Sequence, residues 1–268
     1  MRSRHLPTRW KLGVVSYLNA KPLIAGLETD RRIELVLDVP SRLADLLDRG
    51  VVDVALVPVI DLLREDRDWQ ILSDACIGCD GETLTVRVFS RVPPGQIDTL
   101  HVDGESHTSV ALARIIWHEQ FGRPLDILPY SAARSDPPPK AVLLIGDKVV
   151  NHKPIGFDIQ TDLGLAWKSL TSLPFVFAVW AAPRDRVADA DELSAALCRA
   201  RDSGVVAAGL IAEDYGPGLG WPVALARRYL TTRLKFTLGP RQREGMTRFL
   251  ALAKRYELIS ASKELSFT

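Results

Sequence analysis

Long apolar runs are missing from the sequence. No apolar stretch among the 268 residues approaches the roughly 20 residues that a membrane span needs. The first ten residues are basic, but no apolar segment of about 7–15 residues and no small-residue cleavage site follow them. We therefore expect a cytoplasmic protein that has no export signal and no contact with a membrane.

An excess of one charge is also missing. Lysine and arginine total 34 residues, aspartate and glutamate total 33, and the formal net charge is +1. Such a chain has no net field that would draw it to nucleic acid or to an anionic membrane. We expect no nucleic-acid partner, and an anionic ligand would have to be bound by local groups.

Cysteine is scarce, and its three copies are an odd number, which argues against a secreted disulfide framework. Cys76 and Cys79 form a Cys-x-x-Cys pair on a predicted strand, whereas a redox pair lies at the start of a helix. A zinc site would need two more ligands at similar spacing, and Cys198 stands alone. The histidines show no metal-binding spacing either; they are His5, His101, His107, His118 and His152. We therefore expect inert, buried thiols in the pair and no metal ion.

The sequence does contain an alternation of short apolar runs with helical patterns, which is typical of an α/β protein. The first predicted strand covers 12–17, and Pro22 stands where a helix could begin. Ser41 is a suitable N-cap for a helix that Gly50 ends, and a buried strand follows over 51–57. This order predicts parallel strands with a right-handed crossover.

Two further strands, 69–77 and 83–90, are joined by Asp80-Gly81, a dipeptide typical of hairpin turns. Pro93-Pro94-Gly95 then breaks the pattern and is a candidate hinge. A second unit is predicted after this hinge. It contains a strand over 99–102, a helix over 108–121 ended by Gly122, a strand over 141–145 and a helix capped by Thr161.

The apolar run 175–181 is long enough to return the chain to the first unit, and the remainder is predicted to be helical. Asp189 and Glu192 fit a capping box for a helix that Gly204 closes, and Pro240 opens the last helix. The prediction is a two-lobed α/β fold in which lobe 1 comprises 1–91 and 179–268 and lobe 2 comprises 92–178. Two crossover segments, near residues 90 and 178, join the lobes, and a ligand is expected in the cleft between them.

The segment Ser16-Tyr17-Leu18-Asn19 ends the first predicted strand and precedes a helix. Such a turn presents backbone N–H groups and short polar side chains to a cleft. Ser16 and Asn19 are therefore candidate site residues, although both side chains are also suited to stabilising the turn itself.

The segment Ser106-His107-Thr108-Ser109 opens the helix of the second unit. Hydroxyl groups at a helix N-terminus can bind a carboxylate, helped by unpaired amides and by the helix dipole. The alternative is that one of them simply caps the helix. His107 is the only histidine expected near the cleft.

Gly146-Asp147 follows the apolar strand 141–145 and is placed for ligand contact, or else for capping a helix. The glycines of Gly216-x-Gly218-x-Gly220 lack the preceding strand of a dinucleotide fingerprint. Phosphate loops, a Ser-His-Asp order and a glycosidase-like carboxylate pair are not evident. We therefore predict no cofactor.

These segments together resemble the chorismate dehydratases of the futalosine route to menaquinone. The resemblance runs in order along nearly the whole chain, and two of its motifs, at 15–23 and 174–180, are the most specific. The similar segments are 15–23, 53–58, 77–93, 106–109, 143–147, 161–164, 173–180 and 229–249. The resemblance implies a fold like that of type II periplasmic binding proteins. It also implies loss of water from chorismate, a small dianion, to give 3-[(1-carboxyvinyl)oxy]benzoate without a cofactor.

The implied reaction assigns roles to the candidate residues. Removal of the ring proton pushes negative charge onto the ring carboxylate, which Ser106, Thr108 and Ser109 at a helix N-terminus are suited to stabilise. Asn19 and Ser16 are the catalytic candidates, because they can orient the leaving hydroxyl or the second carboxylate. The remaining substrate-binding candidates are Tyr17, Thr85, His107, Gly146 and Asp147.

The proton acceptor has three candidates: Asp147, His107, and the substrate's own side-chain carboxylate, for which the enzyme would supply the geometry. Two positions depart from the family pattern. Cys79 stands where serine is usual, and His107 stands where arginine is usual and would offer a bidentate fork.

Other functions fit the same fold. One is the sister lyase of the pathway, which forms 1,4-dihydroxy-6-naphthoate. Another is a non-catalytic protein that binds small anions, and a third is the ligand-sensing domain of a regulator. The Ser-Tyr-Leu-Asn segment favours the dehydratase over the sister lyase. The oligomeric state has no signal in the sequence.

Overall fold

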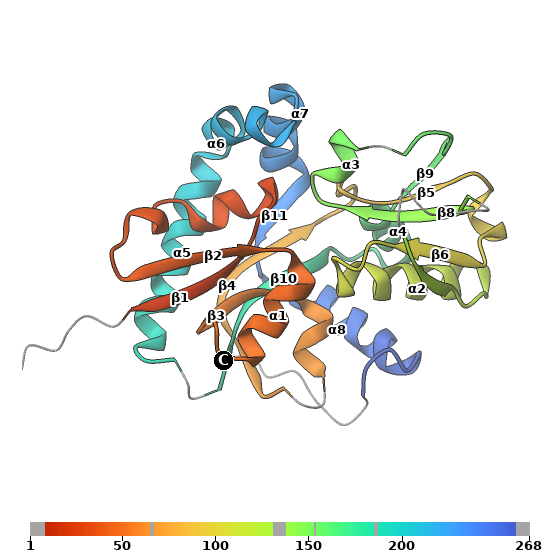
Figure 1. The fold of residues 1–268 in the computed structure, drawn as a ribbon. Coiled ribbons are helices and arrows are strands. Elements are labelled where there is room, and N and C mark those ends of the chain that lie inside the picture. The colour runs from red at the N-terminus through yellow and green to blue at the C-terminus, as the bar shows by residue number, and fades with distance from the viewer. Residues whose placement is uncertain (1–8, 65–66, 131–137, 153, 185–186, 261–268) are drawn as a thin grey trace, which may run out of the picture.

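The computed structural model describes residues 9–64, 67–130, 138–152, 154–184 and 187–260. Within these residues the strands form two mixed sheets, and the chain passes from the first sheet to the second and back (Figure 1). The predicted two-lobed α/β fold with two crossovers is thereby confirmed. No described helix is both long and apolar enough to span a membrane.

The first sheet contains the N-terminal strand and the apolar return strand. Strand β1 is parallel to β3, as the strand–helix–strand order predicts, and also to β2, which was not predicted. Strand β10 is antiparallel to β3 and β4. Among the described residues its order is β11 (Leu234–Thr237), β4 (Trp69–Cys79), β10 (Phe175–Pro183), β3 (Val54–Pro58), β1 (Trp10–Val15) and β2 (Ile33–Asp38).

The second sheet is built around β6 and β8. These two strands are parallel, and β5 is antiparallel to both β8 and β9. Over the described ranges its order is β7 (Asp126–Pro129), β6 (Thr99–Val102), β8 (Ala141–Ile145), β5 (Val86–Ser90) and β9 (Ile159–Asp162). Strands β6 and β8 have the predicted bounds.

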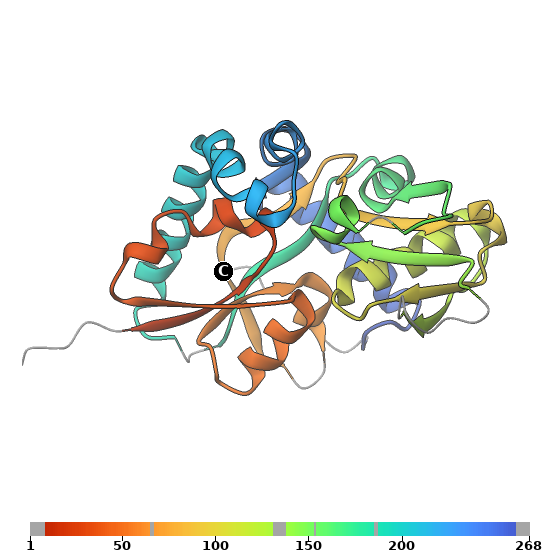
Figure 2. The same ribbon diagram turned by 45° about the horizontal axis from the view of Figure 1, so that its top comes forward.

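Helices flank both sheets. Figures 1 and 2 show α5, α6 and α7 beside the first sheet and α2 beside the second. Their bounds are α1 (Pro40–Asp48), α2 (His107–Phe121), α3 (Lys148–Asn151), α4 (Leu163–Thr171), α5 (Ala190–Val206), α6 (Ala208–Tyr215), α7 (Val223–Arg228) and α8 (Pro240–Arg255). Helix α2 ends at the left-handed Gly122 and α8 begins at Pro240, both as predicted. Ser106 caps α2, so the capping alternative for the hydroxyls of this segment holds for that residue.

The two sheets share one apolar core. Trp167 of α4 packs edge-on against Phe175 of β10, with ring centroids 5.4 Å apart, and Phe175 packs against Phe249 of α8 at 5.0 Å. All three side chains are buried. The elements that follow the second sheet are therefore joined to the first sheet by apolar contacts as well as by the crossovers.

The predicted hairpin at Asp80-Gly81 is wrong. Strand β4 belongs to the first sheet, whereas β5 pairs with β8 and β9 in the second, so the segment 80–85 is the first crossover. The return strand β10 pairs with the first sheet from Phe175 onward. The division into lobes at 91/92 and 178/179 stays a prediction, and sheet membership favours boundaries near 85 and 174.

Three predicted helix starts differ from the structure. Pro22 lies inside a 3₁₀ helix, η1 (Leu18–Ile24), and does not open one. Ser41 is the second residue of α1, because Pro40 takes the first position, where its missing N–H is no loss. Thr161 lies in β9 and does not cap α4. The carboxylate of Asp162 accepts the N–H of Leu165 and caps this helix instead.

The predicted capping box and stop of α5 are also wrong. The Asp189 side chain makes no capping hydrogen bond to this helix. Gly204 lies inside α5, where an added Cβ would be 1.9 Å from the carbonyl oxygen of Pro22. The glycine therefore permits α5 to pack closely on η1 instead of ending the helix.

Candidate functional site

A cavity lies between the two sheets and has about 490 Å³ of empty space, part of it open to solvent. It is lined by the end of β1, the first crossover, the start of α2, the end of β8 and the segment after α7. The lining residues are Val15, Tyr17, Asn19, Pro40, Pro58, Ile77, Thr83, Thr85, Val86, Ser106, Ser109, Ile145, Gly146, Phe177, Ala178, Tyr229 and Leu234. The position matches the cleft predicted from the two-crossover fold.

Asn19, Thr85 and Tyr229 form a polar cluster in this lining. The hydroxyl oxygens of Thr85 and Tyr229 are 2.7 Å apart, and the Asn19 side chain also hydrogen-bonds the Tyr229 hydroxyl. Burial raises the pKa of Tyr229, and the hydrogen bonds from Thr85 and Asn19 only partly oppose this. Tyr229 is therefore a protonated, neutral hydroxyl at neutral pH.

Asn19 also provides an acceptor that the protein leaves unused. Its Oδ1 atom is buried and has no hydrogen-bond partner within the described part of the chain. A buried amide oxygen without a partner is unfavourable by about 1–3 kcal/mol. A ligand with an O–H or N–H group in the cavity would satisfy this atom.

Strained and irregular backbone positions the polar cluster. Leu84 has a φ of 71°, and the N–H groups of Thr83 and Leu84 donate to the Asp162 carboxylate at 3.0 and 2.8 Å. This fixes the crossover that carries Thr85. Tyr229 begins a π-helical turn, η6 (Tyr229–Arg233), a geometry that is frequent at functional sites.

Ser106 and Ser109 form a serine pair at the start of α2. The Ser106 hydroxyl donates to Ser109 Oγ at 2.9 Å and accepts the Ser109 N–H at 3.2 Å. The hydrogen of the Ser109 hydroxyl is therefore available to a ligand oxygen. The positive end of the helix dipole adds to the attraction for an anion.

Tyr17 and Gly146 line the cavity in direct contact. Gly146 has a φ of 64°, and a Cβ at this position would lie 2.6 Å from Cδ2 of Tyr17, so glycine is required here. The Tyr17 hydroxyl donates to Glu105, and burial, together with that carboxylate, raises the pKa of Tyr17. Tyr17 thus joins lobe 1 to the segment that precedes α2.

Asp147 lies beside the cavity and not in its lining. Its carboxylate accepts the Leu18 N–H at 3.3 Å and the Trp221 indole N–H at 2.9 Å. Burial raises its pKa, and these two hydrogen bonds oppose the rise. The Trp221 ring stacks on Tyr229 with centroids 4.8 Å apart. Asp147 therefore helps to position Tyr229, because it accepts the indole hydrogen bond that holds Trp221.

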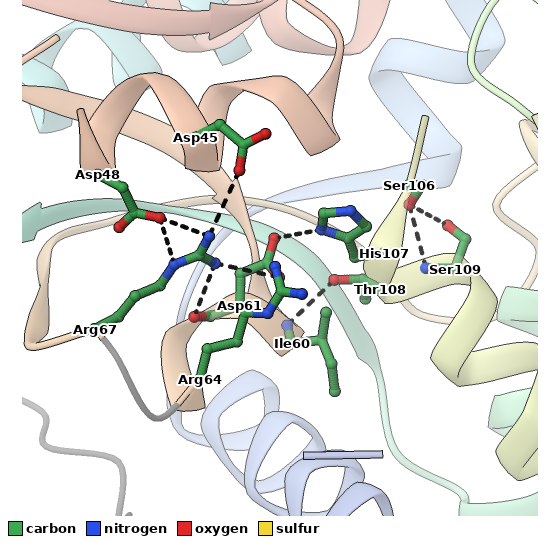
Figure 3. Close-up of polar contacts among 10 residues, drawn as sticks. All are labelled: Asp45, Asp48, Ile60, Asp61, Arg64, Arg67, Ser106, His107, Thr108 and Ser109. Carbon is green, nitrogen blue, oxygen red and sulfur yellow. Dashed lines mark hydrogen bonds and ion pairs between the residues drawn. The ribbon is translucent and has the colours of Figure 1, made fainter. Parts of the chain in front are cut away.

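His107 is absent from the cavity lining, and its ring points towards Asp61 (Figure 3). His107 Nδ1 is 2.8 Å from the Asp61 carboxylate, which is 1% exposed and lies 3.4 Å from the buried guanidinium of Arg67. Arg67 in turn pairs with Asp48 of α1 at 2.7 Å. This charge network ties the first turn of α2 to lobe 1.

The structure thus brings together six of the ten candidate residues and leaves four outside the lining. Ser16 and Thr108 are absent from the lining, and Thr108 Oγ1 accepts the Ile60 N–H at 3.3 Å. Asp147 and His107 are the other two. The six in the lining are Tyr17, Asn19, Thr85, Ser106, Ser109 and Gly146.

Sequence reasoning missed Tyr229 and Trp221. Tyr229 lay in a segment that entered only through its resemblance to a family, and no local pattern singled it out. Trp221 follows a glycine-rich loop and is 3% exposed. The proximity of either residue to Asn19 depends on contacts between segments far apart in the chain.

None of the residues that line the cavity carries a formal charge. In the described ranges, no group of three or more histidine, cysteine, aspartate or glutamate side chains could hold a metal ion. Cys76 and Cys79 are buried, and burial raises the pKa of both thiols, which agrees with the expectation that these thiols are unreactive. An anion in the cavity would therefore be bound by neutral donors and the dipole of α2.

Comparisons with known proteins agree with this fold. A chorismate dehydratase of Thermus thermophilus is 28% identical over 235 residues, covering 82% of this chain and 86% of that protein. A solved structure from Archaeoglobus fulgidus has a TM-score of 0.71 at 15% identity and covers 95% of this chain and 100% of its own. The periplasmic aliphatic sulphonate binding protein of Escherichia coli has a TM-score of 0.65 at 12% identity, with 95% and 94% covered. These structures confirm the periplasmic-binding-protein-like fold.

The family model for menaquinone biosynthesis matches residues 10–255. The match spans both sheets, the cavity between them and all the residues of the polar cluster and the serine pair. The chain therefore belongs to the menaquinone biosynthesis family.

Proposed function

We propose that this protein is a chorismate dehydratase, which eliminates water from chorismate to give 3-[(1-carboxyvinyl)oxy]benzoate. The Thermus thermophilus relative carries this name, and the family acts in menaquinone biosynthesis. The observation that carries the proposal is the cavity itself. It combines a buried, unused amide acceptor with hydroxyl donors and the N-terminus of a helix, and it has no charged lining.

The serine pair suits the charge that develops in this reaction. The ring proton that is lost lies on the carbon bearing the enolpyruvyl ether. This carbon is attached to a ring double bond, which links it to the carbon that bears the ring carboxylate. Removal of the proton increases the negative charge on that carboxylate. Preorganised donors at the positive end of α2, with Ser109 free to donate, stabilise this charge more in the transition state than in the ground state.

Asn19 suits the leaving group. Chorismate at neutral pH has two carboxylates, which only accept hydrogen bonds, and one ring hydroxyl, which can donate. The unused Oδ1 of Asn19 therefore fits the ring hydroxyl better than either carboxylate. In this arrangement Asn19 orients the carbon–oxygen bond that breaks.

The proton acceptor is best supplied by the substrate. Asp147 accepts two hydrogen bonds beside the cavity, and His107 is paired with Asp61 on the far side of the first turn of α2. Of the three candidate proton acceptors, the side-chain carboxylate of chorismate is the one that remains. It can take the ring proton within the bound molecule, provided that the cavity holds it against that carbon.

Incubation of the purified protein with fresh chorismate tests the proposal. We expect an aromatic product that is lighter than chorismate by one water, formed in proportion to enzyme and detected by chromatography and mass spectrometry. Chorismate that binds but is not converted would instead indicate a binding protein. Chorismate that neither binds nor reacts would direct attention to the sister lyase.

A further inference from the structure

The C-terminal half of the described chain contributes six residues to the cavity lining, and Tyr229 is the one among them with an ionisable side chain. It is 1% exposed and lines the cavity, and its hydroxyl oxygen is 2.7 Å from Oγ1 of Thr85, another lining residue. A buried tyrosine hydroxyl normally needs a partner. The direction in which its hydrogen points therefore decides what Tyr229 can do.

The hydrogen-bond pattern allows the hydrogen of Tyr229 to reach a ligand. Asn19 Oδ1 has no partner among the described residues, so the side chain of Asn19 contacts Tyr229 through its amide N–H, which donates to the phenolic oxygen. The hydroxyl oxygens of Thr85 and Tyr229 are 2.7 Å apart, and either can donate to the other. With Thr85 as the donor, the hydrogen of Tyr229 is left for a ligand in the cavity that these residues line.

The surroundings hold the tyrosine ring in one orientation. Its ring stacks on Trp221 with an interplanar angle of 19°, and the Trp221 indole is anchored by its hydrogen bond to Asp147. The same carboxylate accepts the N–H of Leu18, the residue before Asn19. Asn19 and Tyr229 are thus held by a common support, so a single ligand oxygen can lie between them.

We propose that the Tyr229 hydroxyl donates a hydrogen bond to the oxygen of the ring hydroxyl that leaves, while Asn19 Oδ1 accepts the hydrogen of that hydroxyl. This inference rests on the proposed dehydration of chorismate and adds a catalytic residue to it. Thr85 is a positioning residue, which acts by fixing the Tyr229 hydroxyl.

The step is balanced without a proton from the protein. The ring C–H bond and the C–O bond to the hydroxyl break and a carbon–carbon double bond forms. The substrate's side-chain carboxylate takes the ring proton and passes it to the departing hydroxide, which leaves as water. Tyr229 keeps its own proton throughout and stabilises the charge that grows on the departing oxygen. Its raised pKa suits this role, because a neutral donor is needed.

Tyr229→Phe tests the proposal, with Tyr256→Phe as a matched control whose hydroxyl contacts Glu119 instead of the cavity. We expect Tyr229→Phe to lower kcat about 100-fold with KM changed less than about threefold, since the donor acts mainly in the transition state. Tyr256→Phe should keep normal kinetics. Circular dichroism and melting curves establish that both variants are folded.

A double mutant then separates catalysis from positioning. We expect Thr85→Val to lower kcat about 10-fold and Thr85→Val/Tyr229→Phe to be no slower than Tyr229→Phe alone, because Thr85 acts through Tyr229. Strictly additive losses would overturn the positioning role of Thr85. Near-normal kcat in folded Tyr229→Phe would overturn the catalytic role while leaving the dehydratase function intact. A wild-type protein that neither binds nor converts chorismate would overturn both.

Discussion

The polar cluster and the serine pair line the same cavity but are held in place by different kinds of contact. The serine pair depends on hydrogen bonds within one helical turn, between residues three apart. In the polar cluster, Thr85 and Tyr229 are 144 residues apart, and the supporting contact between Leu18 and Asp147 spans 129. One half of the site is therefore a local structure, and the other exists only when the whole chain is folded.

This difference also divides the expected chemistry. The serine pair and the dipole of α2 bind charge that is present on the substrate before the reaction and grows during it. The polar cluster instead acts on the bond that breaks. We therefore expect substitutions in the polar cluster to affect kcat most, and substitutions at the start of α2 to affect binding as well.

The largest effect is expected for Asn19→Ala. Loss of the Oδ1 acceptor should lower kcat about 1000-fold, at the upper end for a single preorganised hydrogen-bonding group. The melting temperature should stay near that of the wild type, because the lost hydrogen bond to Tyr229 is offset by removal of a buried acceptor that no described protein group bonds. Steady-state kinetics with chorismate and a melting curve measure both quantities.

Asn151→Ala is a suitable control for Asn19→Ala. Its side chain donates to the Leu219 carbonyl on the surface, away from the cavity lining. This variant should turn over normally. A folded Asn19→Ala variant with near-normal turnover would remove Asn19 from the mechanism.

A smaller effect is expected at the serine pair, where two neighbouring residues make a matched comparison. Ser109→Ala should lower kcat/KM about 10-fold with little change in stability, because Ser109 lines the cavity. Thr108→Val should instead destabilise the protein by about 1–3 kcal/mol, because it leaves the buried Ile60 N–H without an acceptor. Urea unfolding and kinetics of both variants separate the two roles, and equal kinetic losses would contradict this division.

What the sequence could predict follows the same division. The bounds of β6 and β8 and the Gly122 stop of α2 depend on local patterns, and the structure has all of them. Tyr229 could not be placed, because its neighbours come from the first crossover and from η1. The hairpin at Asp80-Gly81 failed for a related reason: the dipeptide predicts a turn but not the sheet in which the next strand pairs.

His107 illustrates how a candidate can be correct in position and still serve another purpose. The sequence places it at the start of α2 beside the cleft, and the structure directs its ring to Asp61 on lobe 1. The side chain at this position therefore contacts Asp61 and does not line the cavity. Its side chain is 36% exposed, so the contact is only partly shielded from solvent.

A still smaller effect is therefore expected for His107→Gln. Loss of the hydrogen bond to Asp61 should loosen the first turn of α2 and raise KM about threefold, as expected for a partly exposed contact worth less than about 1 kcal/mol. The matched control is His118→Gln, at the other end of α2, where the ring packs on Tyr256. A fall in kcat with unchanged KM would show that His107 acts on the reaction itself.

The last expected effect is on stability and not on kinetics, and it concerns the pH dependence of unfolding at Asp147. Burial raises its pKa in the folded protein, so the folded state binds this proton more tightly than the unfolded state does. The associated stability is fully present below the ordinary pKa of aspartate, about 3.9, and is lost as the pH rises through the raised pKa.

Asp147→Asn keeps an oxygen for the Trp221 indole but cannot ionise. Its free energy of unfolding, measured in urea across this pH window, should therefore fall less with rising pH than that of the wild type, by at most about 1.4 kcal/mol per pH unit. Parallel curves would mean that the carboxylate supporting the polar cluster ionises in the folded protein as readily as in the unfolded chain.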